Sequence, residues 1–593
     1  MKPSNVSNLG ETNSRNHRID NGALIGLARW AAAALLLSVT VSGAAADVWN
    51  VSTFSELRTA ALTAIPGDEI VIAAGDYHVT SNLYITTPDL TFRGATGNRD
   101  DVVLYGNGMN VESGVLEGFW AAASGIRLEN LTIRDFWHHG IHICGNPYAD
   151  NVVISNVRTV NCGERHVKGS AYSGISDNVL IEDLWMEQTE AYLPRPGHSV
   201  DEYNYIGGID AMHINGWTVR RSTAVNIRGA TEGGRAGIFL WNGVENVTLE
   251  QNAILRCGHG ISIGNPSGPN NSHVAPWHAV GGMIRNNFII RRGLTYDWAL
   301  ELDNTKDFKV YNNTIYSDDA TYFRTVQIYD EADEGQTTNL ELINNVVRSH
   351  IRDLTVGGGW TEEAIRAMGN IVDTDGSQVV PAWFVDVANN DLHLTELATD
   401  AIDQAATLAD VTDDIDGDAR PVGLGPDLGA DEYLALPALI SSEPPVDGTL
   451  PKTQNNLILL TFSAAITLPG GPALDIVPLG GGADQGGSFG YSIEPDGVTL
   501  KAVEQGTVLA EQTWCQVTPA AGLAVQPFVL DLSTLIGDCN GSGRVTTADY
   551  SCVKGSLGVY TEDRRDLNGS GRITTADYSV VKSHIGNRLP PKP

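Results

Sequence analysis

Short alternations of apolar and polar residues recur along the chain from Gly125 to about Asn370, at intervals of roughly 20 to 30 residues. Each unit opens with a strand-like segment, often followed by a polar pair such as Asn-Asn and then by a second short strand. The opening segments read NLTIRDF, NVVISNV, NVLIEDL, GWTVRRS, NVTLEQN, GGMIRNN, DFKVYNN and NLELINN. No helical period runs through these units, which excludes a solenoid of helices. The repetition therefore predicts a solenoid built from strands.

The second strands of the repeats can be aligned on their inward positions. Alternation with a period of two places one residue of each strand on a common apolar face. These residues are Ile141, Val167, Ile209, Ile238, Ile261, Leu300 and Val326. Parallel stacking would bury this face continuously, and Asn side chains at the turns can form ladders along the stack. The fold class is therefore mainly β, and we expect a right-handed parallel β-helix over residues 47–435.

The outward positions of the aligned strands form two columns, with neighbouring strands ~4.8 Å apart. The first column is His142, Lys168, Asp210, Phe239, Ser262, Glu301 and Gln327, and the second is Cys144, Ser170, Met212, Trp241, Gly264 and Asp303. His166 is expected on the same exposed face. Aromatic side chains stack on sugar rings and charged groups orient carboxylates or hydroxyls, so this face is the predicted sugar-binding groove.

Long insertions between repeats are expected to form the walls of this groove. The longest spans residues 187–207 and carries Glu190, Arg195, His198 and Asp201, and a second, residues 265–281, carries His273, Trp277 and His278. We expect the substrate to be contacted by Phe239, Trp241, Glu301, Arg195 and His198.

Each end of the predicted solenoid has a distinct sequence motif. Residues 47–106 contain SELRTAALTA, which predicts a short amphipathic helix, and then the first strands. The stretch DIDGDARPVGLGPDLGADEY, ending at Tyr433, resembles a closing motif of bacterial β-helix proteins. It is expected to act as a cap, with calcium binding by its carboxylates as the alternative.

After Tyr433 the composition shifts to Pro, Gly and short β-rich runs such as NNLILLTF and GVTLKAV. Several short strands at close spacing indicate a β-sandwich over residues 436–535. The segment resembles the Ig-like modules that bacteria place between catalytic and anchoring units, which implies a spacer.

The final segment, residues 536–593, contains two nearly identical loops, DCNGSGRVTTAD from Asp538 and DLNGSGRITTAD from Asp566. Each presents oxygen donors at loop positions 1, 3, 5, 9 and 12, with Gly at position 6 and a backbone carbonyl at position 7. The predicted calcium ligands are Asp538, Asn540, Ser542, Arg544, Thr546 and Asp549 in the first loop, and Asp566, Asn568, Ser570, Arg572, Thr574 and Asp577 in the second. A short helix follows each loop. The duplication predicts two bound calcium ions.

These tandem half-EF-hands resemble a type I dockerin over roughly residues 537–587. The resemblance implies binding to a cohesin module on a scaffold or cell-surface protein, with contacts from Thr547-Ala548 and Thr575-Ala576.

The β-helix resembles the pectate-lyase-like superfamily, which includes polysaccharide lyases, pectin hydrolases and uronan epimerases. The resemblance implies an acidic polysaccharide substrate and β-elimination, in which a basic residue removes the proton next to a uronate carboxylate that calcium or Arg has neutralised. Lys168 is the candidate base, because crowding and the nearby Arg165 would lower its pKa. The full catalytic set is Lys168, Asp210, His142, His166 and Arg165. A further calcium ion in the β-helix remains an open alternative.

Two other functions stay open. The first is glycoside hydrolysis by a carboxylate pair, Asp210 with Asp201 or Glu232. The second is a non-catalytic glycan-binding or scaffold protein in which Trp241 holds the sugar.

Composition and charge bear on the partners and the location of the protein. The net charge of -33 argues against nucleic acid as a partner. Residues 1–46 read as a signal peptide with the apolar run Ala31 to Val41 and cleavage before Asp47, an uncleaved anchor being the alternative. No later segment is apolar enough for a membrane span, so a secreted protein is expected. Among six cysteines, Cys539 and Cys552 are the candidate disulfide.

Overall fold

A computed structural model describes most of the chain, with residues 1–45 outside it. The described residues are 46–112, 114–144, 149–170, 174–194, 203–266, 268, 270–291, 298–331, 334–434, 436–506, 509–520, 522–561 and 563–593. Arg195, His198 and Asp201 of the long insertion therefore lie outside the described residues.

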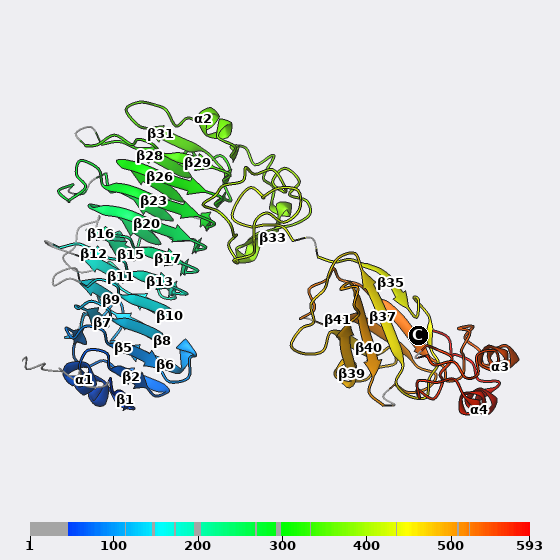
Figure 1. Cartoon of the computed structure of the whole chain (residues 1–593). Coiled ribbons are helices and arrows are strands. Elements are labelled where there is room, and N and C mark those ends of the chain that lie inside the picture. Colours follow the sequence, from blue (N-terminus) through cyan, green and yellow to red (C-terminus); the bar gives the residue numbers. More distant parts are fainter. Residues whose placement is uncertain are drawn as a thin grey trace, which may run out of the picture.

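The first part of the chain is a parallel β-helix (Figure 1). One sheet has ten strands: β4 (Tyr84–Ile85), β7 (Phe119–Ala121), β9 (His139–Cys144), β11 (Arg165–Ser170), β15 (Gly207–Ala211), β19 (Ile238–Leu240), β22 (Ile261–Ile263), β25 (Leu300–Asp303), β28 (Val326–Tyr329) and β31 (Ile351–Leu354). Every neighbouring pair in it is parallel and follows the order of the sequence.

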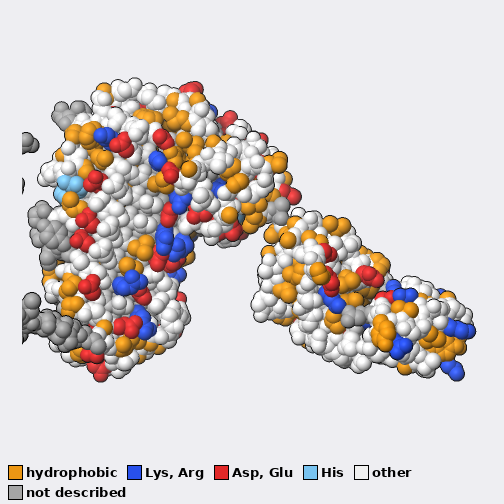
Figure 2. All heavy atoms as spheres, in the orientation of Figure 1, with side chains coloured by type: hydrophobic (Ala, Val, Ile, Leu, Met, Phe, Trp, Pro, Cys, Tyr) orange, Lys and Arg blue, Asp and Glu red, His pale blue; other side chains and the backbone are white. Residues whose placement is uncertain are grey.

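A larger connected sheet of 22 strands forms the rest of the wall. Its strands are β1 (Val48–Val51), β2 (Glu69–Ile72), β3 (Gly75–His78), β5 (Thr91–Gly94), β6 (Val102–Tyr105), β8 (Arg127–Phe136), β10 (Val153–Cys162), β12 (Ser176–Asp177), β13 (Leu180–Glu182), β14 (Trp185–Glu187), β16 (Ile214–Asn215), β17 (Thr218–Arg220), β18 (Thr223–Val225), β20 (Val244–Glu250), β21 (Ala253–Leu255), β23 (Ala279–Arg285), β24 (Phe288–Arg291), β26 (Thr305–Tyr311), β27 (Thr314–Ser317), β29 (Glu341–Ile343), β30 (Val346–Arg348) and β32 (Ile371–Asp373). On the face of the solenoid seen in Figure 2, basic side chains lie next to acidic ones. Arg220, for example, donates to Glu182 at 2.7 Å.

The predicted inward alignment is confirmed by the pairing of the strands. Val167 pairs with Ile141 and Ile209, and the series continues through Ile238, Ile261, Leu300 and Val326. All of these side chains are at most 1% exposed and belong to one continuous core. The apolar alternation therefore fixes the register, since a shift by one residue would turn the polar positions inward.

The predicted asparagine ladder is also present. Asn287 and Asn313 each donate their amide group to the Oδ1 of the next asparagine, at 2.8 and 2.9 Å. The complete run is Asn252, Asn287, Asn313, Asn345 and Asn370. Their second amide protons and oxygens bind backbone groups of neighbouring turns. Buried amides need such partners, which is why identical residues recur at identical positions.

The two ends of the solenoid differ. Helix α1 (Phe54–Thr63) confirms the predicted amphipathic helix; it starts with a capping box of Thr53 and Glu56. Near the other end lie α2 (Glu362–Ala367) and the antiparallel pair β33 (Phe384–Asp386) and β34 (Asp391–Leu394). Helix α2 packs Ile365 onto the end of the solenoid core. The β33–β34 pair and the stretch ending at Tyr433 pack instead on Phe288, Ile290 and Tyr316, on the outside of the larger sheet. They therefore cover a side wall of several turns of the solenoid.

Two four-stranded sheets follow and enclose one apolar core, as expected for a β-sandwich. The first contains β35 (Leu439–Glu443), β37 (Leu457–Phe462), β40 (Thr499–Glu504) and β39 (Phe489–Ile493). The second contains β36 (Thr449–Leu450), β42 (Leu530–Thr534), β41 (Trp514–Pro519) and β38 (Leu474–Pro478).

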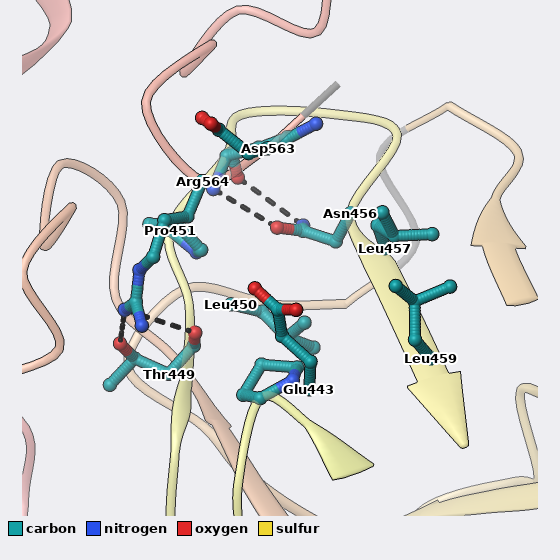
Figure 3. Close-up of a pocket in the computed structure, with 11 residues that line it drawn as sticks. Glu443, Thr449, Leu450, Pro451, Asn456, Leu457, Leu459, Asp563 and Arg564 are labelled. Carbon is teal, nitrogen blue, oxygen red and sulfur yellow. Dashed lines mark hydrogen bonds between the residues drawn. The ribbon is translucent and has the colours of Figure 1, made fainter. Parts of the chain in front are cut away.

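The tail has two helices, α3 (Thr547–Lys554) and α4 (Thr575–His584), each preceded by one of the duplicated loops. It packs on the sandwich: Arg564 of the tail donates to Thr449 Oγ1 at 2.8 Å, beside a pocket of about 140 Å³ (Figure 3). The predicted disulfide is wrong, because Cys539 and Cys552 are free thiols, like the other four cysteines. No helix within the described residues is long and apolar enough to cross a membrane.

Candidate functional site

Three predicted catalytic residues come together on the outer face of the ten-stranded sheet. Lys168 of β11 pairs with His142 of β9 on one side and with Asp210 of β15 on the other. Adjacent parallel strands place equivalent residues one strand spacing apart, so sequence positions far apart become neighbours. The repeat alignment was therefore sufficient to bring His142, Lys168 and Asp210 into one row.

Asp210 is the centre of a buried ionic cluster. Its Oδ1 accepts a hydrogen bond from Lys168 Nζ at 3.0 Å and one from Trp241 Nε1 at 3.2 Å, while Oδ2 accepts from Arg165 Nε. Burial alone would raise the pKa of the Asp210 carboxyl, but Lys168 and Arg165 together lower it well below its usual range. Asp210 is thus a permanent carboxylate that orients the lysine.

Lys168 is the member of this cluster that still reaches the surface. Its side chain is 13% exposed, whereas those of Arg165 and Asp210 are 2% exposed. Burial lowers the pKa of Lys168 and the positive charge of Arg165 lowers it further, while Asp210 opposes both. A lysine with a lowered pKa and an open end has the properties of a general base.

Arg165 has a different position from the one expected of a catalytic residue. Its guanidinium donates to the backbone carbonyls of Glu164 at 2.7 Å and Tyr205 at 3.0 Å, and lies 4.2 Å from the centre of the Tyr205 ring. Because the side chain is buried, Arg165 holds Asp210 from behind the face and positions Lys168 indirectly.

The placement of His166 on the exposed face is wrong. Its side chain is fully buried, and Nδ1 is hydrogen-bonded to Thr159 Oγ1 of β10 at 2.8 Å. Burial lowers its pKa to about 3. His166 lies within β11 but is missing from the strand pairs that include Arg165 and Val167, so the regular pairing that alternation assumes is interrupted at this residue.

The aromatic residues form a platform next to the ionic cluster. The Phe239 and Trp241 rings are stacked with centroids 5.7 Å apart and an angle of 14°. Phe239 is 5% exposed, so it supports Trp241 and offers little surface of its own.

Glu301, expected to contact substrate, is 2% exposed and accepts a hydrogen bond from Gln327 at 3.0 Å.

A second group of carboxylates lies farther along the solenoid. Asp303 follows Glu301 by two residues on β25, is fully buried, and neither of its carboxyl oxygens has a hydrogen-bond partner within the described part of the protein. Burial and the charge of Glu301 raise the pKa of Asp303 to about 9. Of the carboxylates first considered for hydrolysis, Asp210 is bound by Arg165 and Lys168, and Glu232 pairs with Arg228 at 2.6 Å. Asp201 lies outside the described residues.

Sequence reasoning missed three residues at the other edge of the row. Glu117 Oε2 accepts a hydrogen bond from His142 Nδ1 at 2.9 Å, and His139 lies against His142 with ring centroids 5.2 Å apart. Trp120 stands edge-on to His142 at 4.7 Å and pairs with it on the neighbouring strand β7. Burial, helped by nearby positive groups, lowers the pKa of His139 well below its usual range. The segment FWA in β7 was the available signal, because it aligns with the later strands.

The duplicated loops at the C-terminus have matching geometry. Asp538 accepts backbone hydrogen bonds from Ser542 and Gly543 at 2.9 and 2.8 Å, and Asp566 accepts the equivalent bonds at 3.0 and 2.7 Å. These two side chains and those of the twelfth positions, Asp549 and Asp577, are at most 1% exposed. Across the described residues, no Lys or Arg forms an ion pair with any of the four.

This donor set fits calcium. Buried carboxylates without a cationic side chain need a bound cation, and two acidic groups per loop with side-chain and carbonyl oxygens supply the ligands. Ser542 and Ser570 also hold the Arg544 and Arg572 carbonyls at 2.9 and 3.1 Å, at the seventh loop position. The Thr-Ala pairs that start α3 and α4 are exposed.

Comparison with known families identifies the C-terminal part of the chain. Residues 536–586 match the dockerin type I domain family, so the tail is a type I dockerin. No curated protein matches the chain.

Similar solved structures are carbohydrate-active proteins. An alginate lyase from Paenibacillus sp. str. FPU-7 is 14% identical, with 50% of this chain and 99% of that chain covered and a TM-score of 0.30. The catalytic unit of a GH87 α-1,3-glucanase from Streptomyces thermodiastaticus is 15% identical, with coverages of 54% and 65% and a TM-score of 0.33. A PL6 family polysaccharide lyase from Pseudopedobacter saltans is 13% identical, with coverages of 55% and 91% and a TM-score of 0.26.

Proposed function

We propose that this protein is a secreted polysaccharide lyase that cleaves a uronate-containing glycan on the outer face of its β-helix. The observation that carries the proposal is Lys168, a lysine of lowered pKa whose amine is held 3.0 Å from Asp210 Oδ1 and beside Trp241. β-Elimination needs a base for the proton next to the uronate carboxylate, and a partly buried lysine is suited to that step.

Each neighbour has a defined part in the proposed reaction. Lys168 in its neutral form takes the proton from the carbon next to the carboxylate. The bond to the leaving oxygen breaks as a carbon–carbon double bond forms in the sugar, and the leaving oxygen takes up a proton from solvent. Asp210 orients the amine, and Arg165 fixes Asp210. Trp241 offers a ring face for a sugar next to the base.

The test is a panel of uronate polysaccharides incubated with the mature protein in calcium-containing buffer. Ultraviolet absorbance of the unsaturated product should rise with wild type and be absent with Lys168→Ala. Lys168→Arg serves as a second variant, because it retains the charge but has too high a pKa to act as the base. Equal rates for wild type and both variants would refute the assignment.

A second candidate, glycoside hydrolysis, is favoured by the Glu301 and Asp303 pair. A carboxyl whose pKa is raised to about 9 stays protonated at neutral pH, as the acid of a hydrolase must. It ranks below the lyase because both side chains are at most 2% exposed. New reducing ends without an ultraviolet change, abolished in Asp303→Asn, would select it. Glycan binding through Trp241 without any cleavage would select the third function, a binding protein.

The dockerin gives the proposed enzyme an anchor. We expect the tail with its two calcium ions to bind a cohesin module on an extracellular scaffold through exposed residues of α3 and α4. Binding to a type I cohesin in calcium, and its loss in a chelator, is the measurement. Calcium-independent binding would contradict this arrangement.

A further inference from the structure

The outer face of the β-helix carries an additional polar cluster beside the proposed catalytic lysine. It consists of Glu117, which precedes β7, and of His139 and His142 on β9. One ligand atom from each of these side chains lies within 4.8 Å of the other two. The three side chains are between 11% and 13% exposed, so the cluster is recessed but open to solvent.

We propose that Glu117, His139 and His142 bind a divalent transition-metal ion of the zinc class. The distance from His142 Nδ1 to Glu117 Oε2 is 2.9 Å, and that from His139 Nε2 to Glu117 Oε1 is 3.8 Å. Ligands of a tetrahedral ion with bonds of about 2.05 Å lie about 3.3 Å apart. The observed separations lie on either side of this value, and one ligand atom of each group lies within 4.8 Å of the other two, which is a spacing that one ion can span after side-chain adjustment.

The surroundings of His142 match those of metal-bound histidines. Its Nε2 is 2.7 Å from Ser170 Oγ, on the next strand of the sheet. A histidine that binds a metal through one ring nitrogen usually hydrogen-bonds through the other, which fixes the orientation of the ring. Ser170 can fill this role without touching the ion.

The charges on this face also favour a cation. Arg165 and Lys168 are balanced against three carboxylates, those of Asp210, Glu117 and Glu164; Glu164 Oε2 lies 4.0 Å from His139 Nε2. One negative charge is therefore left over next to the cluster. Two imidazole ligands select an ion such as zinc over calcium, which prefers oxygen ligands.

Three protein ligands leave one coordination position open, as in catalytic metal sites. His142 and Lys168 are paired residues on adjacent strands, so a ligand on the ion would lie next to the lysine. The open position suits a substrate carboxylate, which a lyase must neutralise; only this role rests on the proposed function, and the binding of the ion does not.

A second group of possible ligands, His393, Asp416 and Asp431, provides the matched control. His393 Nε2 is 2.9 Å from Asp416 Oδ2, and this pairing raises the pKa of His393 to about 9. The other ring nitrogen, Nδ1, is 2.6 Å from Asp391 Oδ1, so carboxylates engage both nitrogens of His393, as they do in a charged histidine, and the group is an ion pair. It has a similar composition and lies outside the catalytic face, along the side wall.

The experiment measures zinc bound to the full mature chain, by elemental analysis and calorimetric titration with zinc chloride. Millimolar calcium is present throughout to fill the dockerin loops. We expect one zinc ion in wild type, in Lys168→Ala and in Asp416→Asn. We expect none in Glu117→Gln or His142→Ala, and an affinity about 10- to 100-fold weaker in Ser170→Ala.

Cobalt substitution gives a second readout that does not depend on activity. A visible absorption band typical of cobalt bound by nitrogen and oxygen ligands should appear in wild type and disappear in Glu117→Gln. Zinc absent from wild type, or lost equally in Asp416→Asn, would overturn the assignment. If Lys168→Ala keeps its zinc but loses elimination, the metal site and the catalytic base are shown to be separate. If the wild-type protein binds zinc but cleaves no uronate glycan, the proposed lyase activity is refuted and the metal site is not.

Discussion

Replacing Asp210 by Asn should destabilise the β-helix through the cation that it leaves behind. The change keeps the size of the side chain but removes the negative charge between Arg165 and Lys168. Lys168 can turn toward solvent because it is 13% exposed, but Arg165 is 2% exposed and remains buried. Removing one partner of a buried ion pair costs about 3 to 5 kcal/mol.

The local contacts place the expected loss at the lower end of that range. Arg165 keeps its hydrogen bonds to two backbone carbonyls and its contact with the Tyr205 ring. We therefore expect the free energy of unfolding to fall by about 3 kcal/mol. Asp183→Asn is the matched control, because Asp183 pairs with Arg221 where both side chains are about 40% exposed, and such a surface pair contributes about 0 to 1 kcal/mol.

The assay is guanidinium unfolding of the full chain in calcium, followed by tryptophan fluorescence. The Asp210 pKa is lower in the folded than in the unfolded protein, so its stabilisation is complete above about pH 4 and is lost as the pH falls further. The difference between wild type and Asp210→Asn should thus be constant from pH 6 to 8. A loss no larger than that of Asp183→Asn would refute the idea that Asp210 compensates a buried arginine.

Three further predictions concern other parts of the chain. Asp303→Asn should stabilise the β-helix more at pH 8 than at pH 5, as measured by thermal unfolding. Burial raises the pKa of the folded Asp303 carboxyl to about 9, so the wild-type residue costs stability as the pH rises above about 4. An equal effect of the substitution at both pH values would contradict this. Removing calcium with a chelator should expose the buried Cys539 thiol to a thiol reagent, while Cys515 in the sandwich stays protected. Peptide mass spectrometry measures the labelling of each cysteine, and equal labelling of both would contradict unfolding confined to the dockerin. Asn313→Ala should cost about 2 to 4 kcal/mol by leaving ladder partners unpaired, against about 0.5 kcal/mol or less for exposed Asn82→Ala.

The sequence was informative wherever one repeat constrains the next. Val167 and Ile209 had to face inward for the stack to bury its apolar face, which in turn placed Lys168 beside His142 and Asp210. The asparagine ladder followed for the same reason. These features are local patterns repeated at fixed intervals, and the period alone determines which residues meet.

The remaining features depend on contacts that have no period. His166 is buried at a position of β11 where the strand pairing is interrupted, and its ring is hydrogen-bonded to Thr159, a contact that alternation does not describe. Glu117 precedes β7 and His139 is the first residue of β9, so column alignment could not place them next to His142. The stretch ending at Tyr433 packs sideways on Phe288, a contact between segments more than a hundred residues apart.

The difference between regularly repeated positions and irregular ones also indicates where activity can lie on this solenoid. Regular positions such as Phe239 and Glu301 pair with both neighbouring strands and are largely closed to solvent, so they mainly support the face. The Lys168 amine reaches the surface and is oriented by Asp210, which Arg165 binds in turn beneath the Tyr205 ring. A repeated sheet alone would provide a row of equivalent side chains. Departures from the repeat give one of those side chains a distinct pKa, and for this reason the chemistry is expected at Lys168.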